Sequence, residues 1–529
     1  MPQAGVFAEY VDTLGNRQLH TEPELPTIYH SAEFGAANDT QIRQMLDWAE
    51  THLRTESTPG SGKLYWSSNW HPNSGRSYTH STYEMAYGEE LNLALTNYLV
   101  GRGGNAYRIL RAVLCGIFNG PTPGGLSCHS FVDGTQRAND EFADAISMWG
   151  RTVVEGLFGI VPKIPDGYIQ LTPQFPREWE DASIQTPLFS YEWRRAGASI
   201  TISWKSERDV SVHFRIPFHA GEIRHVRLNG NPAKHRMESD KELSWFFAET
   251  PVGNHGTLEL QFTHSPAPEM PVPVKKEELE SARRVWSAPE VPKQDLSLWT
   301  LVDLKDLFNS PVSEVLQRAA DAATPPPLPA NHVNFGYWKE HFWGSRIQAP
   351  CDDAWRRKVG EDGIAWTADG IPFMSVKDGN NIAAITLAGG FPKRLSFPVH
   401  ARGQTLYLMV SGITFPAQSH VVNLRVSLQY ADGRESVMDL VNPFDIGDCW
   451  STWCGRYHDT AANGFENIGG RSGPSGSCEV EDMSKPVALD SEAHLIPFDL
   501  LKDVELASVE VEAVANDVLF GVMGATVLK

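Results

Sequence analysis

The 529-residue sequence has few cysteines and no long apolar run. Its six Cys form no C-x-x-C pair and no His lies at zinc-finger spacing, so a structural zinc site is not expected. No apolar run is long enough to cross a bilayer, and no secretory h-region follows Met1. We therefore expect no membrane association. The expected location is the cytoplasm by default, or outside it if the natural N-terminus lies further upstream.

Positive charge is also scarce in this sequence. Against 65 Asp and Glu there are 45 Lys and Arg, which gives a formal net charge of −20. Nucleic acid and anionic lipid both require a cationic surface, so neither is an expected partner. No G-x-S-x-G motif occurs, and "GRGGN" at 101–105 lacks the Lys-Ser/Thr of a phosphate loop. The sequence thus predicts no cofactor and no metal ion.

Apolar residues at helical spacing dominate the first third of the chain. Residues 1–165 contain four helical patterns, at 40–53, 81–101, 105–120 and 139–159. The second and fourth are apolar on more than one side, as inner helices are. Asn38, Asp39 or Thr40 is expected to cap the first pattern, and Ser81 or Thr82 the second. This placement puts Glu84 in a first helical turn.

From residue 166 the apolar period changes from helical spacing to two. "ASITISW", "VSVHFRI" and "GTLELQF" alternate, and Asn229-Gly230 is a hairpin signal. We predict an antiparallel β-sandwich over 166–265, a Pro-rich linker over 266–295, and a β-rich, jelly-roll-like module over 296–529. In the last module Asp432-Gly433 is expected to turn a hairpin. The fold class is therefore α+β and multidomain.

An ordered set of motifs resembles a known superfamily. "YEMAYGEELNLAL", "PTPGGLSCH", "EFADAISMWGRTVVEGLFGI" and "LTPQFP" occur in this order. They look like the C-terminal part of the six-hairpin glycosidases, close to toroid proteins linked to bacterial degradation of plant polysaccharides. The resemblance implies a partial (α/α)6 toroid of about four or five helices at 1–165, followed by sandwich domains. It leaves three alternatives for the remaining helices: a separate partner chain that carries them, a truncated gene model, or a degenerate remnant.

The same resemblance implies where an oligosaccharide or polysaccharide substrate would bind. Loops 56–83 and 120–140 lead into the helices predicted to be inner, so both loops are expected at one mouth. Sugar sites need aromatic faces and planar polar groups. The candidate substrate-binding residues are Trp70, Asn73, Arg76, Tyr78, Tyr83, His129 and Asn139.

Two chemistries fit these loops. Glycoside hydrolysis needs an acid and a base or nucleophile, for which the candidates are Glu84, Glu141 and Glu24. The alternative is a lyase on a uronate-linked sugar, with His71 or His80 as base and Arg76 holding the carboxylate. In a purely structural interpretation of the same residues, the first-turn carboxylates complement the helix dipole and the His side chains hydrogen-bond the loop backbone. The chain would then be a non-catalytic sugar-binding or structural fragment.

Overall fold

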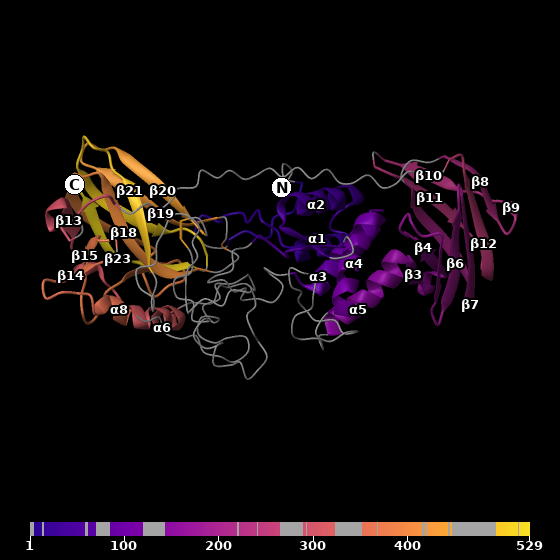
Figure 1. Cartoon of the computed structure of the whole chain (residues 1–529), viewed down its shortest axis with the longest axis horizontal. Helices are drawn as coiled ribbons and strands as arrows, with labels where there is room; N and C mark the ends of the chain where they lie inside the picture. The colour runs from indigo at the N-terminus through magenta and orange to yellow at the C-terminus, as the bar shows by residue number, and fades with distance from the viewer. Residues whose placement is uncertain are drawn as a thin grey trace. The chain divides into compact units, whose positions relative to one another are not determined.

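The computed structural model describes residues 5–12, 15–58, 62–69, 85–119, 143–218, 222–240, 242–264, 289–292, 294–322, 352–367, 369–414, 418, 421–442, 445–446, 493–516 and 518–529. The chain divides into two compact units (Figure 1). The first comprises Met1–Phe7, Pro23–Ser68 and Glu84–Glu277, and the second Ala8–Glu22, Asn69–Tyr83 and Glu278–Lys529. Each unit is described by itself.

The helices and strands of the first unit are α1 (Leu25–Glu33), α2 (Asp39–His52), β1 (Thr55–Thr58), β2 (Gly62–Tyr65), α3 (Tyr87–Leu99), α4 (Gly103–Asn119), α5 (Ala143–Arg151), the π-helix η3 (Thr152–Leu157), β3 (Ile160–Lys163), the 3-10 turn η4 (Ile164–Asp166), β4 (Tyr168–Leu171), β5 (Asp181–Gln185), β6 (Phe189–Ala196), β7 (Ser199–Phe218), β8 (Ile223–Leu228), β9 (Asn231–Pro232), β10 (Arg236–Ser239), β11 (Ser244–Glu249) and β12 (Gly253–Phe262).

Helix α3 lies at the centre of the helical part and contacts α1, α2, α4 and α5. Most of its residues are buried, as its apolar pattern predicts. Helix α2 begins with a capping box, in which Asn38 Oδ1 accepts from the Gln41 amide and the Gln41 side chain accepts from the Asn38 amide, each at 3.0 Å. Of the three predicted caps, the structure therefore uses Asn38.

The fourth predicted helix is less enclosed than its sequence suggested. Its described part is α5, and Ile146 there is 51% exposed. Helix α5 packs against α3 and η3. The prediction of an inner helix is therefore wrong for this described stretch. A second difference is the β1–β2 hairpin, which lies where a loop was predicted between the first two helices.

Strand β7 joins two layers of the sandwich. It is 20 residues long; its first half pairs with β6 and β12, and its second half pairs with β11 and, in parallel, with β4. One strand thus belongs to both layers, as at the corner of a sandwich. Asn229 and Gly230 both have positive φ, 50° and 79°, so the predicted turn is confirmed between β8 and β9.

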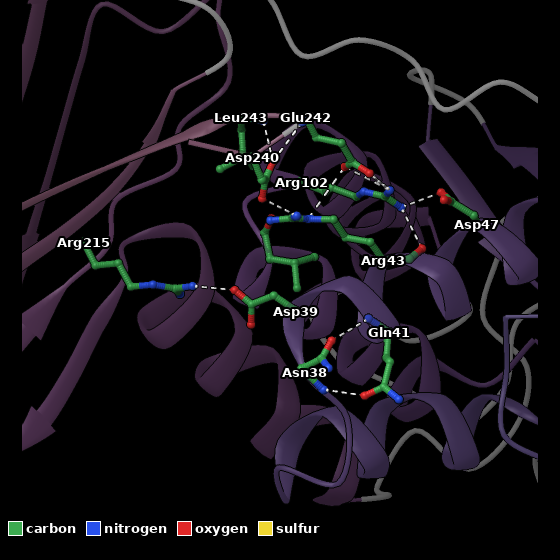
Figure 2. Close-up of polar contacts among 11 residues, drawn as sticks. Asn38, Asp39, Gln41, Arg43, Asp47, Arg102, Arg215, Asp240, Glu242 and Leu243 are labelled. Carbon is green, nitrogen blue, oxygen red and sulfur yellow. Dashed lines mark hydrogen bonds and ion pairs between the residues drawn. The ribbon is translucent and has the colours of Figure 1, made fainter. Parts of the chain in front are cut away.

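Two buried arginines fasten the sandwich to the helices (Figure 2). Arg43 of α2 donates to Asp240 in the turn between β10 and β11. Arg102, before α4, donates to Asp47 at 2.8 Å and to both oxygens of Glu242, at 3.1 and 3.2 Å. The arginine side chains are 7% and 6% exposed, while their carboxylate partners reach solvent. We call these five residues the arginine clasp.

The second unit is built from η5 (Leu296–Leu298), β13 (Trp299–Val302), η6 (Lys305–Leu307), α6 (Val312–Ala322), α8 (Asp353–Arg356), β14 (Ile364–Trp366), β15 (Pro372–Met374), β16 (Ala383–Thr386), β17 (Arg394–Ala401), β18 (Thr405–Thr414), β19 (Val422–Tyr430), β20 (Glu435–Val441), β21 (His494–Asp499), β22 (Leu506–Ala513) and β23 (Val518–Leu528).

Its strands form two facing antiparallel sheets. One runs β17-β22-β19-β20 and the other β13-β23-β18-β21, with β16 also paired to β23. One core cluster combines residues of both sheets, and another joins the second sheet to α6, α8, β14 and β15. Strand β23 is buried at every position because both of its faces are covered. The hairpin predicted at Asp432-Gly433 connects β19 and β20, as expected.

An N-terminal segment belongs to this second unit. Val11 and Leu19 form a β-bridge, and His20 Nε2 lies 2.8 Å from Asp12 Oδ1. The other Asp12 oxygen accepts from the amide of Asn516 at 3.2 Å, across 504 positions of sequence. The fold is α+β with sandwich-like antiparallel sheets. The toroid and the four-part domain division remain predictions.

We expect Arg43→Met to destabilise the first unit by about 1–3 kcal/mol, because the replaced group makes charged hydrogen bonds in a buried site. Burial would raise the pKa of Asp240, but amide donors and Arg43 lower it overall. That stabilisation is present above the unfolded pKa of about 3.9 and is lost as pH falls through the folded value. The difference between wild type and variant, measured by urea unfolding, should shrink in acid.

The matched control is Arg194→Met, because Arg194 and its partner Glu192 are 73% and 65% exposed. Exposed pairs contribute little, so this change should stay within about 0.5 kcal/mol of wild type. An Arg43→Met effect equal to the control would show that the clasp does not stabilise the unit.

A second expectation concerns Gly156 in the π-helix η3. A Cβ at this position would overlap the ring of Tyr98 on α3. Gly156→Ala should therefore lower stability by about 1–3 kcal/mol through overpacking. Gly150→Ala is the control, because a Cβ there meets nothing within 4 Å. Equal urea midpoints for the two variants would contradict the expected close packing.

Candidate functional site

The structure describes one of the candidate residues chosen from the sequence, Glu24. The others lie outside the described residues: Glu84, Glu141, His71, His80, Trp70, Asn73, Arg76, Tyr78, Tyr83, His129 and Asn139. Their roles remain predictions. The described part of the region does, however, hold several carboxyl groups around the start of α3.

Helix α3 begins later than predicted. Its first residue is Tyr87 and its N-cap is Ala86, which is extended at φ −102° and ψ 124°. Glu84 therefore precedes the helix, and the first-turn carboxylates are Glu89 and Glu90. The prediction was wrong because polar residues that can cap a helix were weighted above burial. Ala86 and Tyr87 are 5% and 0% exposed, so the core fixes where the helix starts.

Glu89 is half-buried and contacts a neighbouring helix. The hydroxyl of Tyr29 on α1 donates to Glu89 Oε2. Glu24 is the N-cap of the same α1, extended at φ −87° and ψ 167°, and is also half-buried. A proline in the first two helical positions helps α1 start there. Two half-buried glutamates thus flank α1, one at its start and one bonded to Tyr29 on its side.

Backbone hydrogen bonds bring the residues after β2 next to the start of α1. The Leu25 amide donates to the Ser67 carbonyl at 2.8 Å, and the Trp66 amide donates to the Arg54 carbonyl at 2.8 Å. The Arg54 guanidinium lies 4.5 Å from the centre of the Trp66 ring. Arg54 therefore covers one face of the Trp66 ring.

Glu90 is fully buried behind Glu89. One carboxyl oxygen accepts from the Tyr65 amide, and the other has no hydrogen-bond partner among the described residues. Burial raises the pKa of Glu90 well above its ordinary range, and this outweighs the Tyr65 amide and the charge of Lys63, which lower it. Glu90 therefore keeps its proton at a pH where an exposed glutamate is ionised.

Glu50 on α2 shows the opposite shift. Burial alone would raise its pKa, but the charge of Lys63 and hydrogen bonds from Lys63 and Tyr65 lower it overall. Desolvation and the nearby Glu50 raise the pKa of the Tyr65 hydroxyl well above its ordinary value. The pKa values of Glu50 and Glu90 are thus shifted in opposite directions. Glu50 and Glu90 are 7% and 0% exposed, so neither reaches a substrate.

The candidate residues chosen from the sequence include none of Glu50, Lys63, Glu89 and Glu90. A signal was present for the last two, because apolar residues at helical spacing begin at Tyr87 rather than Ser81. Within the described ranges, no group of three or more His, Cys, Asp or Glu side chains is placed to hold a metal ion. The described helices also include none that is long and apolar enough to span a membrane.

Comparison with known proteins identifies no family for this chain. No family model matches the chain. No curated protein matches it. Among solved structures, the GH127 beta-L-arabinofuranosidase Ara127N from Geobacillus stearothermophilus T6 aligns at 8% identity, covering 46% of this chain and 42% of its own, with a TM-score of 0.23.

Two GH86 proteins also align with this chain. One is BuGH86 in complex with neoagarooctaose, at 9% identity over 65% of this chain and 35% of its own, with a TM-score of 0.12. The other is a beta-porphyranase from Bacteroides plebeius, at 8% identity over 65% and 37%, with a TM-score of 0.13. The chain thus spans less than half of each solved chain. Scores this low do not establish a shared fold.

We expect Glu90→Gln to change how stability depends on pH. A carboxyl whose folded pKa is raised contributes its full stability below the unfolded pKa of about 4.3, and loses it as pH rises toward the folded value. Gln keeps an acceptor for the Tyr65 amide and does not titrate. The variant should therefore match wild type near pH 4 and melt at a progressively higher temperature than wild type as pH rises to about 8.

Thermal unfolding across this pH range measures the effect. Glu249→Gln, at an exposed position on β11, is the control and should follow wild type throughout. Parallel curves for wild type and Glu90→Gln would mean that Glu90 is ionised in the folded state.

Proposed function

We propose that this protein is carbohydrate-active and cleaves a glycosidic bond, with Glu24 and Glu89 as the reacting carboxyl groups. The observation that carries the proposal is the arrangement around α1. Both residues are half-buried, Glu24 occupies the N-cap position of the helix, and Tyr29 of the same helix donates to Glu89. Glycoside hydrolysis requires such a pair, one group to protonate the leaving oxygen and one to act as base or nucleophile.

The immediate surroundings support this chemistry. The buried carboxyl of Glu90 adjoins Glu89, and burial raises its pKa, which favours the uncharged form beside the proposed reacting group. Trp66, which is half-buried, directly follows Tyr65, whose amide donates to Glu90 of α3. The motif "YEMAYGEELNLAL", part of the resemblance to six-hairpin glycosidases, contributes α3 itself.

The proposal also covers the substrate, further candidate residues and a protein partner. The substrate we propose is a side chain of a plant-type polysaccharide. Glu84 and Glu141 remain sequence-based candidates for a further acid or base, and the residues of loops 56–83 and 120–140 for sugar binding. A separate chain that completes the helical array is the proposed protein partner.

Activity should be sought with nitrophenyl glycosides of arabinose, rhamnose and galactose and with plant arabinan and pectin, by release of nitrophenol or reducing ends. We expect Glu24→Gln and Glu89→Gln each to lower kcat by about 10²–10⁴-fold, the usual contribution of a general acid or base. Glu249→Gln, at an exposed sandwich position, should leave kcat unchanged.

Three outcomes would overturn this assignment. Wild-type turnover in both carboxyl variants would place the chemistry on other residues, with Glu84→Gln and Glu141→Gln as the next variants to compare. Release of an unsaturated uronate from pectin would indicate a lyase. Retention of a glycan without any turnover would indicate a binding protein.

A further inference from the structure

Strand β2 is short, and side chains from two helices set its position. Glu90 of α3 accepts from the Tyr65 amide. Glu50 of α2 accepts from both Lys63 and the Tyr65 hydroxyl. β1 and β2 have four residues each, and an isolated two-stranded hairpin is at best marginally stable in water. Contacts from the helices therefore decide where β2 lies.

Glu50 fixes the register of this strand. Lys63 and Tyr65 are two positions apart, so their side chains leave the same face of β2, and both reach Glu50. Leu64, on the opposite face, is 0% exposed. A slip of one residue would exchange the two faces and place Leu64 opposite Glu50. A buried carboxylate would then lose both of its donors, which is costly.

Glu90 connects this strand to the two proposed reacting groups. Along α3 it adjoins Glu89 directly. On the other side, the chain continues from Tyr65 to Ser67, whose carbonyl accepts from the Leu25 amide at 2.8 Å. Leu25 directly follows Glu24. The hydrogen bond between Glu90 and Tyr65 is thus a link in the noncovalent path that joins the two carboxylates.

We propose that Glu90 is a positioning residue, which holds Glu24 in place relative to Glu89 by accepting the Tyr65 amide. The inference rests on the function proposed above, because that function assigns the reaction to Glu24 and Glu89. Glu90 is 0% exposed and does not touch a substrate. Apolar side chains would avoid the desolvation cost of burying a carboxyl, so its presence favours a role in fixing geometry.

The test compares Glu90→Leu with Glu90→Gln in the full chain. Leu removes the acceptor, and Gln keeps one. The matched control is Thr96→Val, because Thr96 is buried on the same helix and its hydroxyl donates to the Asn92 carbonyl within that helix, at 2.9 Å. The first measurement is amide hydrogen exchange in a peptide covering residues 62–68, with a β12 peptide as internal reference. The second is kcat and KM on whichever of the glycosides named above the wild type cleaves.

We expect Glu90→Leu to accelerate exchange at 62–68 by tenfold or more relative to β12, and to lower kcat by a similar factor with little change in KM. Glu90→Gln should retain both values, and Thr96→Val should behave as wild type. Unchanged exchange in Glu90→Leu would overturn the inference whether or not the protein is active. Faster exchange with unchanged kcat would also overturn it, because Glu90 would then hold β2 in place without affecting the reaction.

A third result would also overturn the inference. If Glu90→Gln lost activity as fully as Glu90→Leu while keeping normal exchange, the proton of Glu90 would be required for the chemistry itself. If the wild type cleaved none of the substrates, the proposed function would fail and with it the link to Glu24 and Glu89. The exchange data would still show whether Glu90 holds β2, so the two failures are distinguishable.

Discussion

The contact on which the candidate site depends is the hydrogen bond from the Tyr65 amide to Glu90. It ties a four-residue strand to the central helix α3, and burial raises the pKa of the accepting carboxyl. The pKa of Glu50 is lowered, because Lys63 and Tyr65 both donate to it. Two carboxyls with opposite pKa shifts thus hold one strand from two sides.

The buried charged groups are of the opposite sign where the helices meet the sandwich. In the arginine clasp the buried groups are guanidiniums, and their carboxylate partners reach solvent. Arg102 bonds two carboxylates and a backbone carbonyl, so its donors are occupied by structural partners. This arrangement joins two parts of the first unit and leaves little capacity for a ligand. The carboxyl cluster at α3 is therefore the better functional candidate, although the clasp contains more ion pairs.

Much of the fold could be predicted from local patterns. Asn38 caps α2, Asn229-Gly230 turns β8 into β9, and Asp432-Gly433 connects β19 and β20. Each depends on residues close together in sequence, whose preferences are strong. The start of α3 was misplaced because Ser81 and Thr82 satisfy the same local rule, while burial of Tyr87 decides the boundary. The β1–β2 hairpin was missed because its strands are short and are held by distant helices.

The sequence by itself determined the order of most helical and β segments and several of their turns. These follow from side-chain spacing and backbone preference, which act over a few residues. Only the tertiary structure decided which carboxyls are buried, protonated or partly exposed, since a pKa depends on neighbours brought together by folding. It also placed Asp12 against Asn516, in a contact between the two ends of the chain that no local pattern predicts.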